Sequence, residues 1–528
     1  MPHGVLVADE LSQEGIEILR RAGLRVDVRV GLKPEELERV IGGYEAVAVR
    51  SATKITASVL ARAGRLKVVG RAGVGVDNVD LDAATRSGVV VMNTPAGSSV
   101  TVAELTLAMM LALSRHIAQA TASVKAGKWE KKRFQGHELA GKTLGVVGIG
   151  NIGSVVVDRA RAMKMQVLAY DPFISPESAG QLGVELVPLD ELWQRADVVS
   201  LHVPLTDKTR ALVNGESLAR MKKGALLVNC ARGGLVDEKA LAQALRSGHL
   251  GGAALDVFEK EPPASDNPLL ALDNFICTPH LGASTEEAQA AVACAICEQL
   301  VAYLAHGEVR NAVNVPAMSR EALLRFGPYL ALAGKLGSLA AQVAPGGARE
   351  VKIEFAGELA EAPQRPLTAA VLKGLLSHFE ASPVNEVNAP AMAKERGIAV
   401  REERTAGSHD YVSLLTVAVC GEGEEAVVAG TVFGKKDARI VRVNQFRLEA
   451  VPEGEIILCE NDDSPGVVGN IGATLGAAGV NIARISLSRD ETRTAAVSLL
   501  NVDSAPGADV LERLKGLPHV RQVRHIVL

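Results

Sequence analysis

GKTLGVVGIGNIG, residues 141–153, joins a short apolar strand to the start of a helix through closely spaced glycines. In a G-x-G-x-x-G motif the first glycine permits a tight turn, the second admits a pyrophosphate, and the third allows close contact between helix and strand. The following helix N-terminus adds free N–H groups and positive dipole. Glycines that only end a strand would look the same, so a second feature is needed.

Asp171 is that second feature. It ends the next predicted strand, VLAYD, eighteen positions after the last glycine of the motif. A carboxylate at this place accepts hydrogen bonds from an adenosine ribose and repels a 2′-phosphate, so the site is expected to prefer NAD to NADP. The expected cofactor contacts here are Gly148, Gly150, Asn151, Ile152, Gly153 and Asp171.

On both sides of this motif, short β-branched runs alternate with helix-length segments, which predicts parallel sheets covered by helices. One such α/β unit spans about residues 5–92. A long helix is expected from Val100 to Ala126, and a second series of strands follows near 144–149, 166–170, 198–202, 226–229 and 252–255. An apolar helix from about Glu286 ends at His306 and Gly307, and NAVNVP (311–316) is expected to run back to the first unit.

The last part of the chain has a different character. Residues 317–451 combine helices around 323–343 with alternating strands, which indicates an α+β unit. After residue 452 the predicted order is strand, helix, strand, strand, helix, strand, the βαββαβ order of a ferredoxin-like unit. The predicted fold class is therefore α/β, with two Rossmann-like or flavodoxin-like parallel-sheet units followed by these two α+β units.

Composition agrees with a large globular chain. With 528 residues, 48% hydrophobic and 22% charged, it is long enough for several domains and too apolar for wholesale disorder. Lys and Arg total 57 against 61 Asp and Glu, a net charge of −4 that gives no long-range attraction to nucleic acid or anionic lipid. We expect no nucleic-acid partner.

The chain begins MPHGVLVADELS, which lacks the pattern of a secretory signal or a transit peptide, so a cytoplasmic location is expected. The apolar stretch from Ala290 to Ala305 carries Glu298 and is shorter than the ~20 residues of a membrane span, so no membrane helix is expected. Six cysteines are sparse. Cys294 and Cys297 form a C-x-x-C without a second pair, and no metal is expected.

Three residues near predicted strand ends have the chemistry to act on a hydroxy acid. Arg232, in NCARGGLVDE, can hold a carboxylate through two parallel hydrogen bonds. His280, in CTPHLGAST, can take a hydroxyl proton near neutral pH, and Glu261, in DVFEKEPP, can stabilise the charged imidazole. Isolated residues of these types are often ordinary surface or packing groups. Their shared position beyond strand carboxyl ends, where ligands of α/β sheets bind, favours a site.

Together GIGNIG, Asp171, NCARGGLVDE, DVFEKEPP and TPHLGAST resemble the D-isomer-specific 2-hydroxyacid dehydrogenases over about residues 1–316. The resemblance implies that Arg232 binds the substrate carboxylate, Glu261 modulates the base and His280 transfers the proton. It also implies a substrate domain of residues 1–97 and 286–316 and an NAD-binding domain of 98–285. Further cofactor contacts are implied at Val203, Cys230, Ala231, Arg232, Asp256, His280 and Gly282, with Asp256 on the nicotinamide carboxamide.

Within that family, AVRSATKIT, GRAGVGVDNVD and VMNTPAGSS are similar to the 3-phosphoglycerate dehydrogenases, so D-3-phosphoglycerate is the expected substrate. A phosphate needs positive charge and open N–H groups, for which Arg50, Arg71, Gly73 and Gly75 are candidates. The basic run Lys131, Lys132 and Arg133 either adds to the site from a neighbouring subunit or is solvated surface. Val74 stands where several relatives have Thr, which removes a hydroxyl contact to the cofactor.

The C-terminal segment ENDDSPGVVGNIGATLGAAGVNIARISLSR resembles an ACT domain, residues 452–528, a module that binds amino acids. The resemblance implies L-serine as effector, held by Asn461, Asp463 and Asn481, although these residues also suit a turn and a strand start. Residues 317–451 resemble the intervening domain of the long phosphoglycerate dehydrogenases, with Arg439, Arg442 and Arg447 as candidates for an anion site or a solvated face. A homotetramer is implied.

The expected activity is therefore NAD-dependent oxidation of D-3-phosphoglycerate to 3-phosphohydroxypyruvate, the first step of L-serine biosynthesis, with feedback by L-serine. Two alternatives stay open. One is a sister enzyme of the same fold, such as a glyoxylate or hydroxypyruvate reductase. The other is an NADH-sensing regulatory protein, because corepressors of this fold keep the Arg, Glu and His set.

Overall fold

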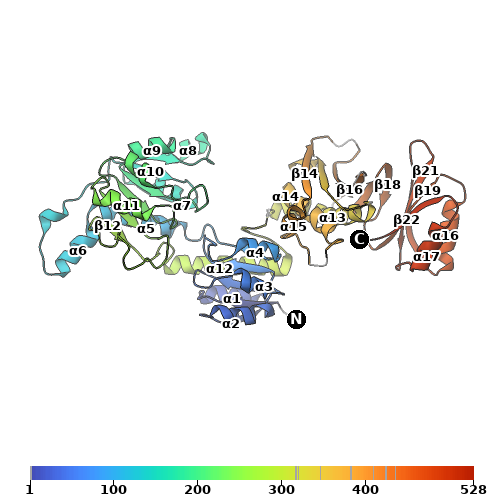
Figure 1. The fold of residues 1–528 in the computed structure, drawn as a ribbon, viewed down its shortest axis with the longest axis horizontal. Coiled ribbons are helices and arrows are strands. Elements are labelled where there is room, and N and C mark those ends of the chain that lie inside the picture. The colour runs from blue at the N-terminus through green and yellow to red at the C-terminus, as the bar shows by residue number, and fades with distance from the viewer. Residues whose placement is uncertain are drawn as a thin grey trace.

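A computed structural model describes residues 3–315, 318, 320–344, 346–380, 383–407, 410–421, 425–434 and 436–528. Four β-sheets follow one another along these residues, each with its own helices. Figure 1 shows an elongated molecule in which the first unit joins the second at one side and the third and fourth at the other. The expected domain boundary at 316 and 317 lies outside the described residues.

The first sheet has five parallel strands in the order β2-β1-β3-β4-β5. Its central strands are buried on both faces, as their continuous Val and Ala runs predict. The strands are β1 (Gly4–Val7), β2 (Arg25–Val28), β3 (Ala46–Val49), β4 (Val68–Arg71) and β5 (Val90–Met92). The helices are α1 (Gln13–Arg21), α2 (Pro34–Val40), η1 (Ile41–Gly43), α3 (Ala57–Ala61) and α4 (Leu81–Arg86).

Helix α12 (Glu286–His306) returns to this first unit, as expected, and packs on α1 and β4. Thr285 caps its start and Gly307, with φ +68°, ends it in the left-handed conformation. The extended segment that follows runs beside β5, where the amide of Val313 donates to the carbonyl of Val91 at 2.8 Å. Figure 1 shows α12 lying among the helices of the first unit.

By length and composition α12 is long and apolar enough to cross a membrane. Helices α5 (Ser99–Ser114) and α6 (Ile117–Lys125) together also meet that test, although they are bent by 63°. Helix α12 is longer than the apolar stretch from Ala290 to Ala305 on which the sequence prediction was based. Its residues Val292, Ile296 and Leu300 are buried in the core of the first unit, so its apolar character has a packing partner within the protein.

The second sheet has seven parallel strands in the order β12-β11-β10-β9-β6-β7-β8. They are β6 (Thr143–Val147), β7 (Gln166–Tyr170), β8 (Glu185–Leu186), β9 (Val198–Leu201), β10 (Leu226–Asn229), β11 (Gly252–Leu255) and β12 (Phe275–Cys277). The helices are α5 (Ser99–Ser114), α6 (Ile117–Lys125), η2 (Lys131–Phe134), α7 (Asn151–Ala162), α8 (Pro176–Leu182), α9 (Leu189–Arg195), α10 (Gly215–Arg220) and α11 (Glu238–Arg246). All five strands expected from the sequence are present.

One expectation for this unit is wrong. The predicted single helix from Val100 to Ala126 is two helices, α5 and α6, joined at Arg115 and His116. His116 has φ +53°, a left-handed conformation that an α-helix cannot continue through. Propensity alone does not reveal this break, because no proline or glycine marks it.

The third sheet has six strands in the order β14-β13-β15-β16-β17-β18, antiparallel except for the pair β13 and β14. Its strands are β13 (Glu350–Gly357), β14 (Ala399–Thr405), β15 (Ser413–Cys420), β16 (Glu425–Phe433), β17 (Asp437–Val443) and β18 (Phe446–Ala450). Its helices are α13 (Arg320–Val343), η3 (Glu358–Glu361), α14 (Gln364–Leu376) and α15 (Ala389–Glu395). The α+β prediction for this region is confirmed.

The fourth unit confirms the βαββαβ prediction. Its elements are β19 (Glu455–Asp462), α16 (Val467–Ala477), β20 (Ile482–Arg489), β21 (Ala495–Val502), α17 (Ala508–Lys515) and β22 (Val520–Val527). The antiparallel sheet has the order β20-β21-β19-β22. Strand β21 is buried at every position, because one face packs on α16 and α17 and the other joins the core of the third unit.

Candidate active site between the first two units

The glycine-rich loop after β6 has the geometry that its sequence predicts. Gly148 has φ +95°, which favours glycine. A Cβ on Gly153 would lie 2.1 Å from the carbonyl oxygen of Gly148, so only glycine permits this close contact between α7 and the loop. A Cβ on Gly150 would meet no atom within 4 Å, which leaves open space in front of the helix N-terminus. The loop therefore fits a pyrophosphate held by backbone N–H groups.

The other residues expected at this loop lie around it. Asn151 and Ile152 open α7, and the side-chain amide of Asn151 donates to the carbonyl of Pro95 in the first unit at 3.3 Å. Asp171, directly after β7, accepts from the backbone amides of Ile149 and Phe173 at 2.8 and 2.9 Å. Val203 borders Gly148 from the end of β9. The carboxylate of Asp171 thus lies against the glycine loop, where it could accept hydrogen bonds from the ribose of a bound dinucleotide.

Arg232 is presented by a turn directly after β10. The side chain of Asn229 holds this turn, because its amide donates to the carbonyl of Arg232 at 2.8 Å and its oxygen accepts from the amide of Ala231 at 3.0 Å. Cys230 is buried against Met109, and burial raises the pKa of its thiol to about 12. The thiol of Cys230 is therefore packed in the core, and a contact between its backbone and the cofactor stays a prediction. Asn229, which ends the apolar strand β10, was not singled out from the motif.

Asp256 lies beneath the loop that carries His280. It is 1% exposed, and its carboxylate accepts from the hydroxyl of Thr278 at 2.5 Å and from the amides of Leu281 and Gly282 at 2.7 and 2.9 Å. These three bonds fix the backbone of the loop. Direct contact between Asp256 and a nicotinamide carboxamide stays a prediction.

His280 and Glu261 are in contact. The Nδ1 atom of His280 lies 2.8 Å from Oε2 of Glu261, and Oε1 of Glu261 accepts from the amide of Phe258 at 3.1 Å. His280 has φ +56°, a conformation held by the loop above Asp256. The imidazole side chain is 51% exposed, so its second nitrogen, Nε2, is left to exchange a proton with a ligand.

Arginines from both units meet at this site. Nε of Arg232 donates to Asp77 of the first unit at 3.1 Å, and Nη1 donates to the carbonyl of Ala231 at 2.7 Å. Burial, and then the positive charges of Arg232 and Arg50, lower the pKa of Arg71 to about 10, against the opposing effect of the carboxylates of Asp77 and Asp9. Within the described part of the chain, Nε of Arg71 has no hydrogen-bond partner. The site therefore concentrates positive charge that an anionic ligand can match.

The two glycines expected at this site leave room for those side chains. A Cβ on Gly73 would lie 1.7 Å from Nη1 of Arg71, and one on Gly75 would lie 2.1 Å from Nη2 of Arg232. The carbonyl of Val74, between them, accepts from the side-chain amide of Asn93 at 2.5 Å. The backbone of this loop is thus defined without a hydroxyl at position 74.

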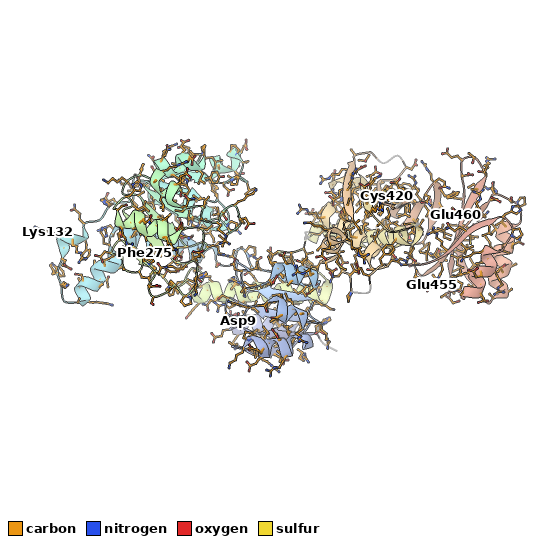
Figure 2. The ribbon with its side chains drawn as sticks, in the orientation of Figure 1. Asp9, Lys132, Phe275, Cys420, Glu455 and Glu460 are labelled. Carbon is orange, nitrogen blue, oxygen red and sulfur yellow. The ribbon has the colours of Figure 1, made fainter. Side chains whose placement is uncertain are left out.

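The basic run after α6 is remote from these groups. Lys131, Lys132 and Arg133 form η2, and Arg133 pairs with Asp273 at 2.8 Å. Figure 2 shows Lys132 at the outer end of the second unit and Asp9 in the first unit, far from it. Within one chain the run does not reach the arginine cluster, so a contribution from a neighbouring subunit stays a prediction.

The three expected effector residues are not together in one chain. Asn461 is buried at the end of β19, and Asp463 follows it and pairs with Arg489 at 3.2 Å. Asn481 precedes β20, at the opposite end of the strand from Arg489, and donates to Asp503 at 2.7 Å. A ligand bound by all three residues would need two copies of the chain.

The arginines proposed for an anion site in the third unit each have a local partner. Arg439 pairs with Asp437, Arg442 donates to the carbonyl of Asn444 at 2.6 Å, and Arg447 pairs with Asp410 at 3.0 Å. Arg442 and Arg447 lie opposite each other on β17 and β18. No ligand follows from this arrangement.

A glycine-rich loop suited to a dinucleotide, an arginine and a histidine–glutamate pair, all beyond the carboxyl ends of strands, are typical of an NAD-linked dehydrogenase of 2-hydroxy acids. The family described as D-isomer specific 2-hydroxyacid dehydrogenase, NAD binding domain, matches residues 107–282. The D-3-phosphoglycerate dehydrogenase intervening domain matches residues 325–444, and the ACT domain matches residues 456–519.

Relatives cover the whole chain. D-3-phosphoglycerate dehydrogenase of Methanocaldococcus jannaschii is 46% identical over 99% of both chains, and that of Bacillus subtilis is 40% identical over 99% of both. The chain belongs to the D-3-phosphoglycerate dehydrogenase family, and it is an NAD-dependent oxidoreductase.

Solved structures match the first two units. The TT0316 protein from Thermus thermophilus has a TM-score of 0.55 at 41% identity, covering 59% of this chain and 99% of its own. An NAD⁺-bound 3-phosphoglycerate dehydrogenase from Entamoeba histolytica has a TM-score of 0.52 at 29% identity, covering 60% of this chain and 100% of its own.

Proposed function

We propose that Arg232, Glu261 and His280 carry out the oxidation of D-3-phosphoglycerate to 3-phosphohydroxypyruvate, the first step of L-serine biosynthesis. The observation that supports this most directly is the 2.8 Å contact between Nδ1 of His280 and Glu261. It leaves Nε2 as the nitrogen that accepts the hydroxyl proton, while the carboxylate of Glu261 stabilises the imidazolium that forms. Nicotinamide, when bound, supplies the acceptor for the hydride that leaves carbon two.

Arg232 binds the substrate carboxylate in this proposal. Asp77 accepts a hydrogen bond from the Nε atom of Arg232, so a substrate carboxylate either binds another edge of the guanidinium or displaces Asp77. Arg50 and Arg71, with the backbone of Gly73 and Gly75, receive the phosphate. Among the described residues Nε of Arg71 has no partner, which supports an anion at that place.

For the chain as a whole we propose a homotetramer in the cytoplasm, with a substrate-binding domain (1–97 and 286–316), an NAD-binding domain (98–285), an intervening domain (317–451) and an ACT domain (452–528). L-serine is the proposed effector. It would be held between two ACT domains, by Asn461 and Asp463 of one copy and Asn481 of another. The match to the ACT domain supports this, as does the separation of these residues within one chain.

L-serine is expected to inhibit the protein, with an inhibition constant at least about tenfold higher in an Asn481→Ala protein, because one hydrogen-bonding partner is lost. Initial rates at rising L-serine measure this effect. D-serine is the control ligand and should inhibit less than L-serine does. Asn470→Ala, a change at an exposed position, is the control variant and should be inhibited by L-serine as the parent protein is. Equal inhibition by both serine enantiomers, or an unchanged response in Asn481→Ala, would contradict the proposed effector site.

A further inference from the structure

Asp9 is a buried carboxylate in the first unit that no motif explained. It follows β1, is 4% exposed, and accepts hydrogen bonds from three donor groups in one segment of the chain. The amide of Arg50 donates to it at 2.6 Å, and the amide and hydroxyl of Thr53 donate to it at 3.2 and 2.6 Å. A buried carboxylate needs such donors, and here they all belong to residues 50–53. Figure 2 shows Asp9 in this unit.

Asn78 holds the same segment from the other side. Its side-chain amide donates to the carbonyls of Arg50 and Thr53, each at 2.7 Å. The backbones are joined as well, because the amide of Ile55 donates to the carbonyl of Asn78 at 2.8 Å. Asp9, Thr53 and Asn78 therefore form a polar clamp that fixes the backbone of residues 50–53 to the end of β1 and to the loop between β4 and α4.

The residues of the clamp adjoin residues of the candidate active site. Asn78 adjoins Asp77, whose carboxylate accepts from Nε of Arg232 in the second unit. Arg50 itself lies within the clamped segment, and the loop that carries Asn78 also carries Gly73 and Gly75. A small shift of these loops would move the proposed phosphate-binding groups relative to the backbone of Arg232, which Asn229 holds at the end of β10.

We propose that Asp9, Thr53 and Asn78 are positioning residues that set the distance between the phosphate-binding and carboxylate-binding groups, and thereby the preference for a phosphorylated hydroxy acid. This inference rests on the proposed phosphate roles of Arg50 and Arg71. The hydrogen bonds of the clamp lie within the first unit, whereas the dinucleotide loop and His280 belong to the second, so the clamp acts on the substrate side.

Thr53 offers a matched pair of variants. Thr53→Val keeps the shape of the side chain and removes the hydroxyl that donates to Asp9, whereas Thr53→Ser keeps the hydroxyl. The Thr53→Val protein is expected to show a KM for D-3-phosphoglycerate about tenfold higher, with KM for NAD unchanged, because a buried carboxylate loses a donor and its loop loosens. Thr53→Ser should return KM to within about threefold of the parent value.

The decisive readout is the comparison with D-glycerate, which lacks the phosphate. Its inhibition constant against D-3-phosphoglycerate should change less than about threefold in Thr53→Val. Thr431→Val is the control, because Thr431 is also buried and donates to the carbonyl of Ser413 in the third unit. The Thr431→Val change should leave KM for D-3-phosphoglycerate and the inhibition constant of D-glycerate unaltered. Equal weakening of the two acids in Thr53→Val, or no change in either, would overturn the proposal.

Arg50→Met and Arg71→Met, which remove the positive charge, separate this inference from the assignment on which it rests. If they leave the preference for the phosphorylated acid intact, the proposed phosphate roles fail. If they remove that preference and Thr53→Val does not, the clamp proposal alone fails. Ligand-free unfolding temperature and KM for NAD, measured for every variant, identify proteins that are merely misfolded.

Discussion

A His280→Asn protein is expected to oxidise D-3-phosphoglycerate ~10²–10⁴-fold more slowly than the parent, which is the usual contribution of a positioned general base. Asparagine can still donate a hydrogen bond towards Glu261, so the loop above Asp256 should keep its shape. It cannot accept the hydroxyl proton at neutral pH. Stopped-flow or steady-state measurement of NADH formation gives the turnover number, and KM for NAD is expected to stay within about threefold.

His378→Asn is the control for this change. His378 follows the end of α14 in the third unit, where its ring lies edge-on to that of Phe379. Its replacement should leave turnover unaltered. A His280→Asn protein that retains turnover within about threefold of the parent would remove His280 from the proposed mechanism.

An Arg232→Met protein is expected to lose about 2–5 kcal/mol of transition-state binding, the usual loss when one partner of a charged, hydrogen-bonded pair is truncated. At about 1.4 kcal/mol per factor of ten this is roughly a 30- to 4,000-fold fall in kcat/KM. Methionine keeps much of the apolar stem, so packing near Ala231 is preserved. Steady-state kinetics with D-3-phosphoglycerate as the varied substrate measure the effect.

Arg232→Lys should recover only part of the loss, because an ammonium is a point charge and cannot form two parallel bonds to a carboxylate. The matched control is Arg195→Met, which removes a surface arginine paired with Glu185 and Glu191. That change should leave kcat/KM as it is. Full activity in Arg232→Lys would show that charge alone suffices, and full activity in Arg232→Met would exclude Arg232 from carboxylate binding.

Local motifs predicted much of the fold and of the site. The alternation of β-branched runs with helix-length segments predicted the parallel sheets. The glycine pattern at 148–153 predicted the start of α7, and Gly148 and Gly153 make close backbone contacts that only glycine permits. Arg232, Glu261 and His280 could be named from their motifs, because each follows a strand or a loop with a recognisable pattern. The alternation of apolar residues in the last part of the chain was enough to order the elements of the fourth unit.

Other features depend on residues far apart in sequence and were not predictable. Asp9 and Thr53 are 44 positions apart, and their contact exists only because β1 and β3 are neighbours in the sheet. The break at His116 arises from backbone geometry without a glycine or proline to mark it. The separation of Asn481 from Asp463 follows from the direction of β20, which a set of motif residues does not convey.

The most direct test of the proposed activity follows NADH formation with D-3-phosphoglycerate, D-lactate, D-glycerate and D-2-hydroxyglutarate as substrates, each at matched protein and NAD concentrations. We predict strong preference for the phosphorylated acid, because the guanidinium groups of Arg71 and Arg232 lie against the same loop, at Gly73 and Gly75. Turnover with an unphosphorylated acid alone would assign the protein to a sister enzyme of the same fold. NADH binding without turnover on any of the four acids would contradict the enzymatic assignment itself.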